Sequence, residues 1–67
     1  MRKYGYLDGL ACTWNEHEAW LCGDNRKWQR ITVSEASRHA ALMTEAEYHE
    51  TFGKLPAMPK AAFQTNG

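Results

Sequence analysis

The strongest constraint on the fold is a dipeptide, Asp8-Gly9, that stands between two runs of strand-forming residues. The first run is Tyr-Gly-Tyr-Leu at residues 4–7, and the second is Leu-Ala-Cys-Thr-Trp at residues 10–14. A tight type I′ turn needs two successive residues with positive φ, and an Asp-Gly pair adopts these values readily. The pair therefore predicts a β-hairpin near the start of the chain.

Two further turn clusters extend this hairpin into a meander. Polar residues 15–18 separate the second strand from an apolar run at residues 19–22. The Gly-Asp-Asn cluster at residues 23–25 then precedes another extended run at residues 26–32. Short apolar runs separated by turn residues are typical of an antiparallel sheet. We expect three or four strands in the first half of the chain.

Capping signals indicate helices in the second half. Thr32 and Thr44 are each followed three residues later by a glutamate, the pattern that satisfies unpaired N–H groups at a helix start. Apolar residues recur with helical spacing on both sides of Thr44, but the two stripes do not join. The sequence predicts two short helices, or one bent helix over residues 34–52, with Gly53 as the C-cap.

Length and composition favour one folded domain. A chain of 67 residues has room for a single hydrophobic core, and a hydrophobic content of 43% with three tryptophans is typical of globular proteins. We expect an α+β domain over residues 1–53, with both helices packed on one face of the antiparallel meander. Residues 54–67 contain two prolines and are expected to form an extended or flexible tail.

The predicted strand register places three tryptophans on one face of the sheet. A turn centred on His17 and a three-residue loop at residues 23–25 would align Trp14, Trp20 and Trp28 across neighbouring strands. The alanines of the helical half are small enough to approach a surface filled by indole rings. We therefore expect the tryptophan face to be the core beneath the helices.

The opposite face of the predicted sheet is also apolar. It carries Tyr4, Tyr6, Leu21 and Ile31, where a solvent-facing surface is normally polar. A slipped register, a tail that folds back over the sheet, or isolated surface tyrosines would each account for this pattern. Our hypothesis is a non-enzymatic interaction or regulatory protein that binds a partner protein or forms a homodimer through this face.

A second possible ligand surface lies around one tryptophan. Arg26 and Arg30 flank Trp28, and a basic sheet with exposed aromatic rings can stack single-stranded bases. Eight basic residues are balanced by eight acidic ones, so net charge provides no general attraction to nucleic acid. Single-stranded nucleic-acid binding through Arg26, Trp28 and Arg30 is the alternative function.

The sequence shows no catalytic or metal-binding signature. Cys12 lies among apolar residues with no group to activate its thiol, and the glycines do not form a phosphate-binding loop. Cys12, His17 and Cys22 have suitable donor atoms for zinc but include no closely spaced pair, so we expect no metal site, no cofactor and no enzymatic activity. A disulfide between Cys12 and Cys22 fits the predicted register, but a reducing cytosol disfavours it.

The helical half of the chain resembles a group of phage-derived proteins. Residues 31–36, 42–48 and 52–56 are similar to the small uncharacterised open reading frames of enterobacterial prophages. The resemblance implies a bacterial, cytoplasmic accessory protein that binds a host or phage protein. The first residues also lack the apolar run of a signal peptide or membrane-spanning helix, so we expect a cytoplasmic protein without membrane contact.

Overall fold

The Asp8-Gly9 turn forms the predicted hairpin. In the computed structural model, which describes residues 1–63, β1 (Lys3–Leu7) pairs with β2 (Leu10–Trp14) in antiparallel fashion. Asp8 and Gly9 have φ values of 53° and 79°, as a type I′ turn requires at its two central positions. The hairpin prediction is confirmed.

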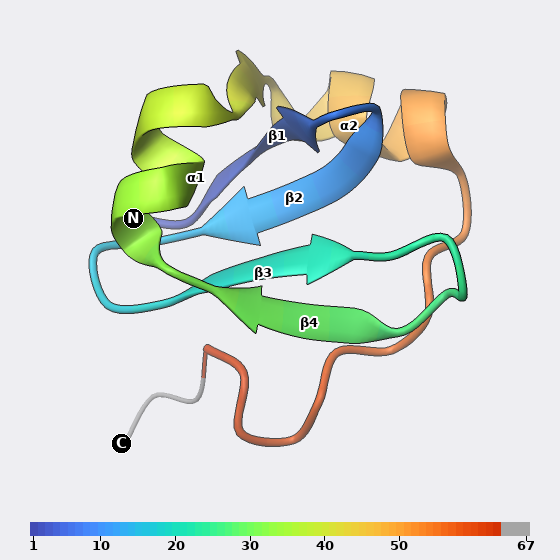
Figure 1. Ribbon diagram of the computed structural model, residues 1–67. Helices are drawn as coiled ribbons and strands as arrows, with labels where there is room; N and C mark the ends of the chain where they lie inside the picture. Colours follow the sequence, from blue (N-terminus) through green and yellow to red (C-terminus); the bar gives the residue numbers. More distant parts are fainter. Residues whose placement is uncertain (64–67) are drawn as a thin grey trace.

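Within residues 1–63, the sheet contains five antiparallel strands, and Figure 1 shows their arrangement. β3 (Ala19–Cys22) and β4 (Trp28–Ile31) continue the meander, and β5 (Ala41–Met43) pairs with the outer side of β1. The strand order is β4-β3-β2-β1-β5. The predicted α+β class and the meander are confirmed. The fifth strand was not predicted, because three apolar residues are too few to show an alternating pattern and also fit a helical stripe.

Both helices begin at the predicted threonine caps. The helices are α1 (Val33–His39) and α2 (Glu45–Phe52). Thr32 and Thr44 each accept a hydrogen bond at Oγ1 from the N–H of the residue three positions later, at 3.1 Å. Glu47 accepts a bond from the Thr44 N–H at 3.0 Å, which completes a capping box, and Gly53 ends α2 with φ of 64°. Because β5 separates the helices, the alternative of one bent helix is wrong.

The predicted row of three tryptophans does not form. Trp14 lies opposite Ala19 rather than Trp20, one residue away from the predicted pairing. The cause is the loop after β2, where the Asn15 N–H donates to Glu18 O at 2.9 Å and Asn15 Oδ1 accepts from the following N–H groups of the loop. A shift of one residue moves every side chain of a strand to the other face of the sheet.

The loop between β3 and β4 also differs from the predicted one. It is longer than three residues, and Arg26 takes the left-handed conformation within it, with φ of 60°. As a result Trp20 lies opposite Arg30 rather than Trp28. Trp20 and Trp28 still share a face of the sheet, whereas Trp14 points to the other one.

Each face of the sheet is buried under its own helix. The buried residues on the α1 side are Cys12, Trp14, Ala19 and Ala36, and those on the α2 side are Ala11, Cys22 and Tyr48. In Figure 1, α1 lies in front of the sheet and α2 behind it. The expectation that both helices pack on one face is therefore wrong. The apolar character of the second face is explained by α2, which packs on it.

The chain after α2 folds back over the α2 side of the sheet. Trp28 Nε1 donates to Pro56 O at 2.9 Å, and the Phe63 N–H donates to Glu18 Oε1 at 2.8 Å. Leu55 packs on the buried cluster beneath α2. Up to residue 63, the predicted tail is thus packed against the domain, as the fold-back alternative expects. Residues 64–67 of that tail lie outside the described residues.

Gly5 is a position in β1 where a side chain has no room. A Cβ at Gly5 would overlap the backbone carbonyl oxygen of Ala41 in β5 and would lie 3.2 Å from the indole of Trp14. We expect Gly5→Ala to displace β5 and to lower the free energy of unfolding by about 1–3 kcal/mol, measured by urea denaturation. Gly23→Ala is the control, because its closest neighbour is the movable Asn25 side chain. Equal losses in the two variants would contradict this account.

Candidate functional site

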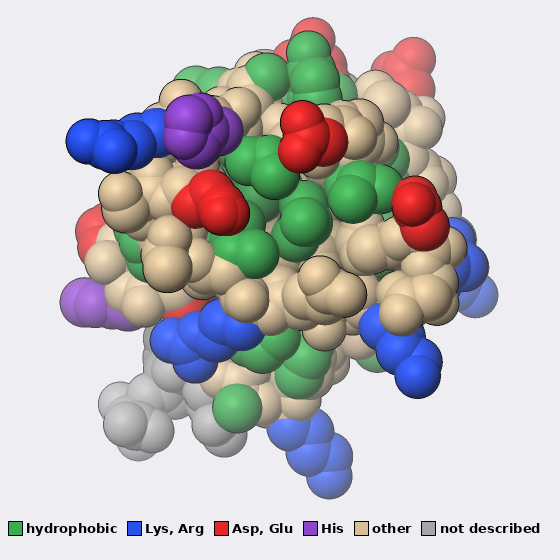
Figure 2. Space-filling view, in the orientation of Figure 1, with side chains coloured by type: hydrophobic (Ala, Val, Ile, Leu, Met, Phe, Trp, Pro, Cys, Tyr) green, Lys and Arg blue, Asp and Glu red, His purple; other side chains and the backbone are tan. Residues whose placement is uncertain are grey.

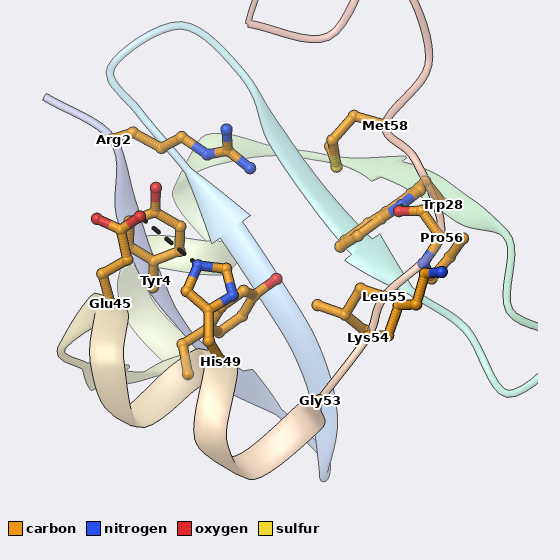
Figure 3. Close-up of a pocket in the computed structure, with 11 residues that line it drawn as sticks. Arg2, Tyr4, Trp28, Glu45, His49, Gly53, Lys54, Leu55, Pro56 and Met58 are labelled. Atoms are coloured by element: carbon orange, nitrogen blue, oxygen red, sulfur yellow. Dashed lines mark hydrogen bonds and ion pairs between the residues drawn. The ribbon is translucent and has the colours of Figure 1, made fainter.

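A cavity of about 400 Å³ opens on the α2 side of the sheet (Figure 3). It is enclosed by the start of the chain and β1, by β4, and by α2 with the segment that follows it. We call this cavity the α2 pocket. Its lining residues are Arg2, Tyr4, Trp28, Glu45, Tyr48, His49, Gly53, Lys54, Leu55, Pro56 and Met58. Its volume lies in the range of cavities that hold small organic ligands.

Arg2 is held in a defined orientation in this pocket. Its Nε donates to Thr13 Oγ1 at 2.9 Å, and the buried Thr13 hydroxyl donates in turn to Lys3 O at 2.8 Å. The guanidinium carbon lies 5.3 Å from the ring centroid of Tyr4 and 4.3 Å from that of Phe63, both within cation–π range. Within residues 1–63 the two terminal nitrogens make no hydrogen bond, so they are free to meet an anion.

Tyr48 brings a buried hydroxyl to the same pocket. The residue is 2% exposed, and its ring centroid lies 5.0 Å from that of Tyr4 and 5.5 Å from that of Phe52. Among the described residues, the hydroxyl has no hydrogen-bond partner. Burial raises the pKa of Tyr48 to about 12. The hydroxyl is therefore protonated at neutral pH and can donate a hydrogen bond.

The charged groups of the pocket are of both signs. Glu45 Oε2 lies 3.5 Å from His49 Nε2, one helical turn away on α2. Figure 3 shows this pair beside Tyr4. Arg2 and Lys54 add positive charge, whereas the Glu45 carboxylate opposes the binding of a strongly negative ligand.

A second candidate surface lies on the α1 side of the sheet. Leu42 of β5 is 69% exposed and lies opposite Gly5, and the half-buried Leu7 and Leu21 belong to the same side. We call these three leucines the leucine surface. A groove of about 500 Å³ adjoins Leu7 and is lined by Leu7, Asp8, Glu35 and His39. Figure 2 shows hydrophobic side chains gathered in the middle of this face, with acidic, basic and histidine side chains around them.

The four residues predicted to form one partner face do not share a face. Tyr4 and Tyr6 point to the α2 side, where Tyr4 packs on the buried cluster. Leu21 and Ile31 pack on the opposite, α1-side cluster. The predicted common face of Tyr4, Tyr6, Leu21 and Ile31 is thus wrong, because the loop after β2 shifts the register of β3 and β4 by one residue.

The residues of the alternative ligand surface make contacts within the chain. Arg26 Nη2 donates to Lys54 O at 2.8 Å. The half-buried Trp28 donates a hydrogen bond from Nε1 to Pro56 O in the same C-terminal segment. The guanidinium carbon of Arg30 lies 5.8 Å from the ring centroid of Trp20. Trp28 lines the α2 pocket and is half-buried, so it is not an exposed platform on which successive bases of a strand can stack.

The two cysteines point to opposite faces of the sheet. Cys12 lies opposite Leu21 in the α1-side cluster, and Cys22 belongs to the α2-side cluster. Both are free thiols, and the register rules out a disulfide between them. Burial, with a smaller contribution from Glu35, raises the pKa of Cys12 to about 11, so its thiol is protonated at neutral pH and is a poor nucleophile.

Residues 1–63 contain no group of three or more His, Cys, Asp or Glu side chains placed to share a metal ion. Cys12, His17 and Cys22 are accordingly not brought together. In the described part of the chain, no helix has both the length and the hydropathy needed to cross a bilayer.

Comparison with family models, with curated proteins and with solved structures gave no match. The α2 pocket and the leucine surface are the two candidate sites of this protein. Neither surface was predicted from the sequence as a unit. In the sequence, Leu42 and Tyr48 are members of the apolar runs on either side of Thr44, and Arg2 is one of eight basic residues. No sequence signal marks a hydroxyl that will be buried without a partner.

Glu18 connects the C-terminal segment to the sheet. Its Oε1 accepts from Trp20 Nε1 at 2.7 Å and from the Phe63 N–H at 2.8 Å, and these bonds lower the pKa of Glu18 from 4.5. A carboxylate whose pKa is lowered by folding stabilises the fold fully at pH values above its pKa in the unfolded chain. This stabilisation is lost as the pH falls through its pKa in the folded protein.

We expect acidification below pH 4.5 to weaken these bonds, because protonated Glu18 is a poorer acceptor. In ¹H–¹⁵N spectra, the Phe63 amide and the Trp20 indole N–H should shift together. Glu18→Ala should produce similar shifts at pH 7, and the exposed Glu50→Ala should not. A common midpoint at or above the ordinary glutamate pKa would contradict the proposed bonds.

Proposed function

We propose that this protein is a small non-enzymatic interaction domain that binds another protein through its leucine surface. The observation that carries the proposal is Leu42, a large apolar residue that is 69% exposed on an edge strand. Leu7 and Leu21 lie on the same side of the sheet and are only partly covered. An exposed apolar surface rimmed by polar residues is typical of protein interaction sites.

The groove beside Leu7 defines the chemistry of the partner. Asp8 and Glu35 line it together with His39. At neutral pH the groove is therefore edged by more negatively charged side chains than positively charged ones. A segment with one bulky apolar side chain flanked by lysine or arginine would complement this arrangement. Two copies of this chain in a symmetric contact would bring their acidic rims together, which favours a different protein as the partner.

The proposal includes a bacterial cytoplasmic setting. This part rests on the resemblance of the helical half to prophage open reading frames, which implies an accessory protein that acts on a host or phage protein. Single-stranded nucleic-acid binding, the alternative, has less support. Trp28 and Arg26 are bonded to the C-terminal segment, and the balanced charge gives no general attraction to phosphates.

Photo-crosslinking can identify the partner. A benzophenone amino acid is placed at Leu42 or, as a control, at Tyr6, which is 42% exposed on the opposite side of the sheet. After irradiation in a lysate of the source cells, we expect one discrete protein adduct from position 42 and none from position 6. Mass spectrometry identifies the captured protein, which is then purified for measurements of affinity.

Calorimetry with the purified partner tests the surface itself. Leu42→Glu should weaken binding at least about tenfold, because it places a charge in a desolvated contact. Glu35→Gln should weaken binding and reduce its dependence on salt, and Tyr6→Ser should leave the affinity unchanged. An affinity insensitive to Leu42→Glu, or an adduct of two copies of this chain, would overturn the proposal.

A further inference from the structure

The α2 pocket has walls suited to a flat, apolar group. Tyr4 and Trp28 contribute aromatic rings, and Leu55 and Met58 contribute aliphatic surface. Figure 3 shows Trp28 and Met58 across the opening from Tyr4. The Trp28 ring is fixed by its bond to Pro56 O at 2.9 Å. A ligand that enters this space would therefore meet a preformed apolar site.

Tyr48 supplies an unused polar group to the same site. Its hydroxyl is buried and has no hydrogen-bond partner within residues 1–63, although buried hydroxyls are normally paired. Such a group opposes folding, because it has lost its bonds to water without replacement. A ligand oxygen within reach of this hydroxyl would accept its hydrogen bond and replace the lost bond to water.

Arg2 supplies the matching charge. Its Nε is taken by Thr13, while its terminal nitrogens make no hydrogen bond with the described residues. A planar guanidinium held in this way fits the two oxygens of a carboxylate. The Glu45 carboxylate on the α2 wall places a negative charge nearby, which opposes a second negative charge on the ligand.

From this geometry we propose that the α2 pocket binds a small organic carboxylate with an aromatic body. The body lies between Tyr4 and Trp28, and the carboxylate meets the Arg2 guanidinium with one oxygen near the Tyr48 hydroxyl. The site lies on the opposite side of the sheet from the leucine surface. It is therefore independent of the proposed partner, and its test requires no partner.

Naphthalene-2-carboxylate is the probe, and the neutral naphthalene-2-carboxamide is its matched control. Binding is followed by calorimetry and by the indole N–H signal of Trp28 in ¹H–¹⁵N spectra. We expect the carboxylate to shift the Trp28 signal and to bind at least about tenfold more tightly than the amide, since only the carboxylate forms a charge-assisted pair with Arg2.

Two variants separate this site from a merely structural role. Arg2→Gln should abolish the preference for carboxylate over amide, whereas Arg38→Gln, on the exposed side of α1, should leave it unchanged. Tyr48→Phe removes only the unpaired hydroxyl. It should weaken binding of the carboxylate by about fivefold to tenfold while the melting temperature of the free protein stays the same or rises.

The result is decisive in either direction. Carboxylate preference that depends on Arg2, together with weaker binding but undiminished stability in Tyr48→Phe, supports the site. An unshifted Trp28 signal at millimolar probe, equal binding of acid and amide, or unchanged affinity in Tyr48→Phe would overturn it. A lowered melting temperature in Tyr48→Phe would show that the hydroxyl already has a partner, and would also overturn it.

Discussion

The structure depends on the burial of β2 on both of its faces. Four successive residues, from Ala11 to Trp14, are at most 5% exposed, which is possible only when each face of the sheet has its own cover. Helix α1 supplies one cover and α2 the other. Because side chains alternate along a strand, the position of β2 decides which residues of the neighbouring strands join each cluster.

This arrangement also decides where ligands can approach. On the α2 side, an eight-residue helix does not reach across the sheet to β4, and the chain that follows it folds back to pack there. The α2 pocket is bounded by these parts and by the residues around the first strand. On the α1 side, a seven-residue helix leaves part of the apolar face uncovered, which produces the leucine surface.

Each candidate site includes a group that does not serve stability. Leu42 leaves a large apolar side chain in water, and Tyr48 buries a hydroxyl without a partner among the described residues. Elsewhere in residues 1–63, buried side-chain oxygen and nitrogen atoms have hydrogen-bond partners, as for Thr13, whose hydroxyl accepts from Arg2 Nε and donates to Lys3 O. Local departures from the rules of stable packing are expected where a protein binds something else, and here they mark two separate surfaces.

The sequence by itself determined the hairpin at Asp8-Gly9, the two threonine-capped helices and the end of α2 at Gly53, because turns and caps are set by contacts among residues a few positions apart. Only the tertiary structure decided the strand register. Between β2 and β3, that register pairs Trp14 with Ala19 and not with Trp20. That register depends on how the Asn15 side chain closes its loop, a choice that alternation of apolar residues does not reveal when both faces are apolar. The pairing of β5 with β1 and the assembly of the α2 pocket were likewise decided by tertiary structure, since they join residues that are far apart in the sequence.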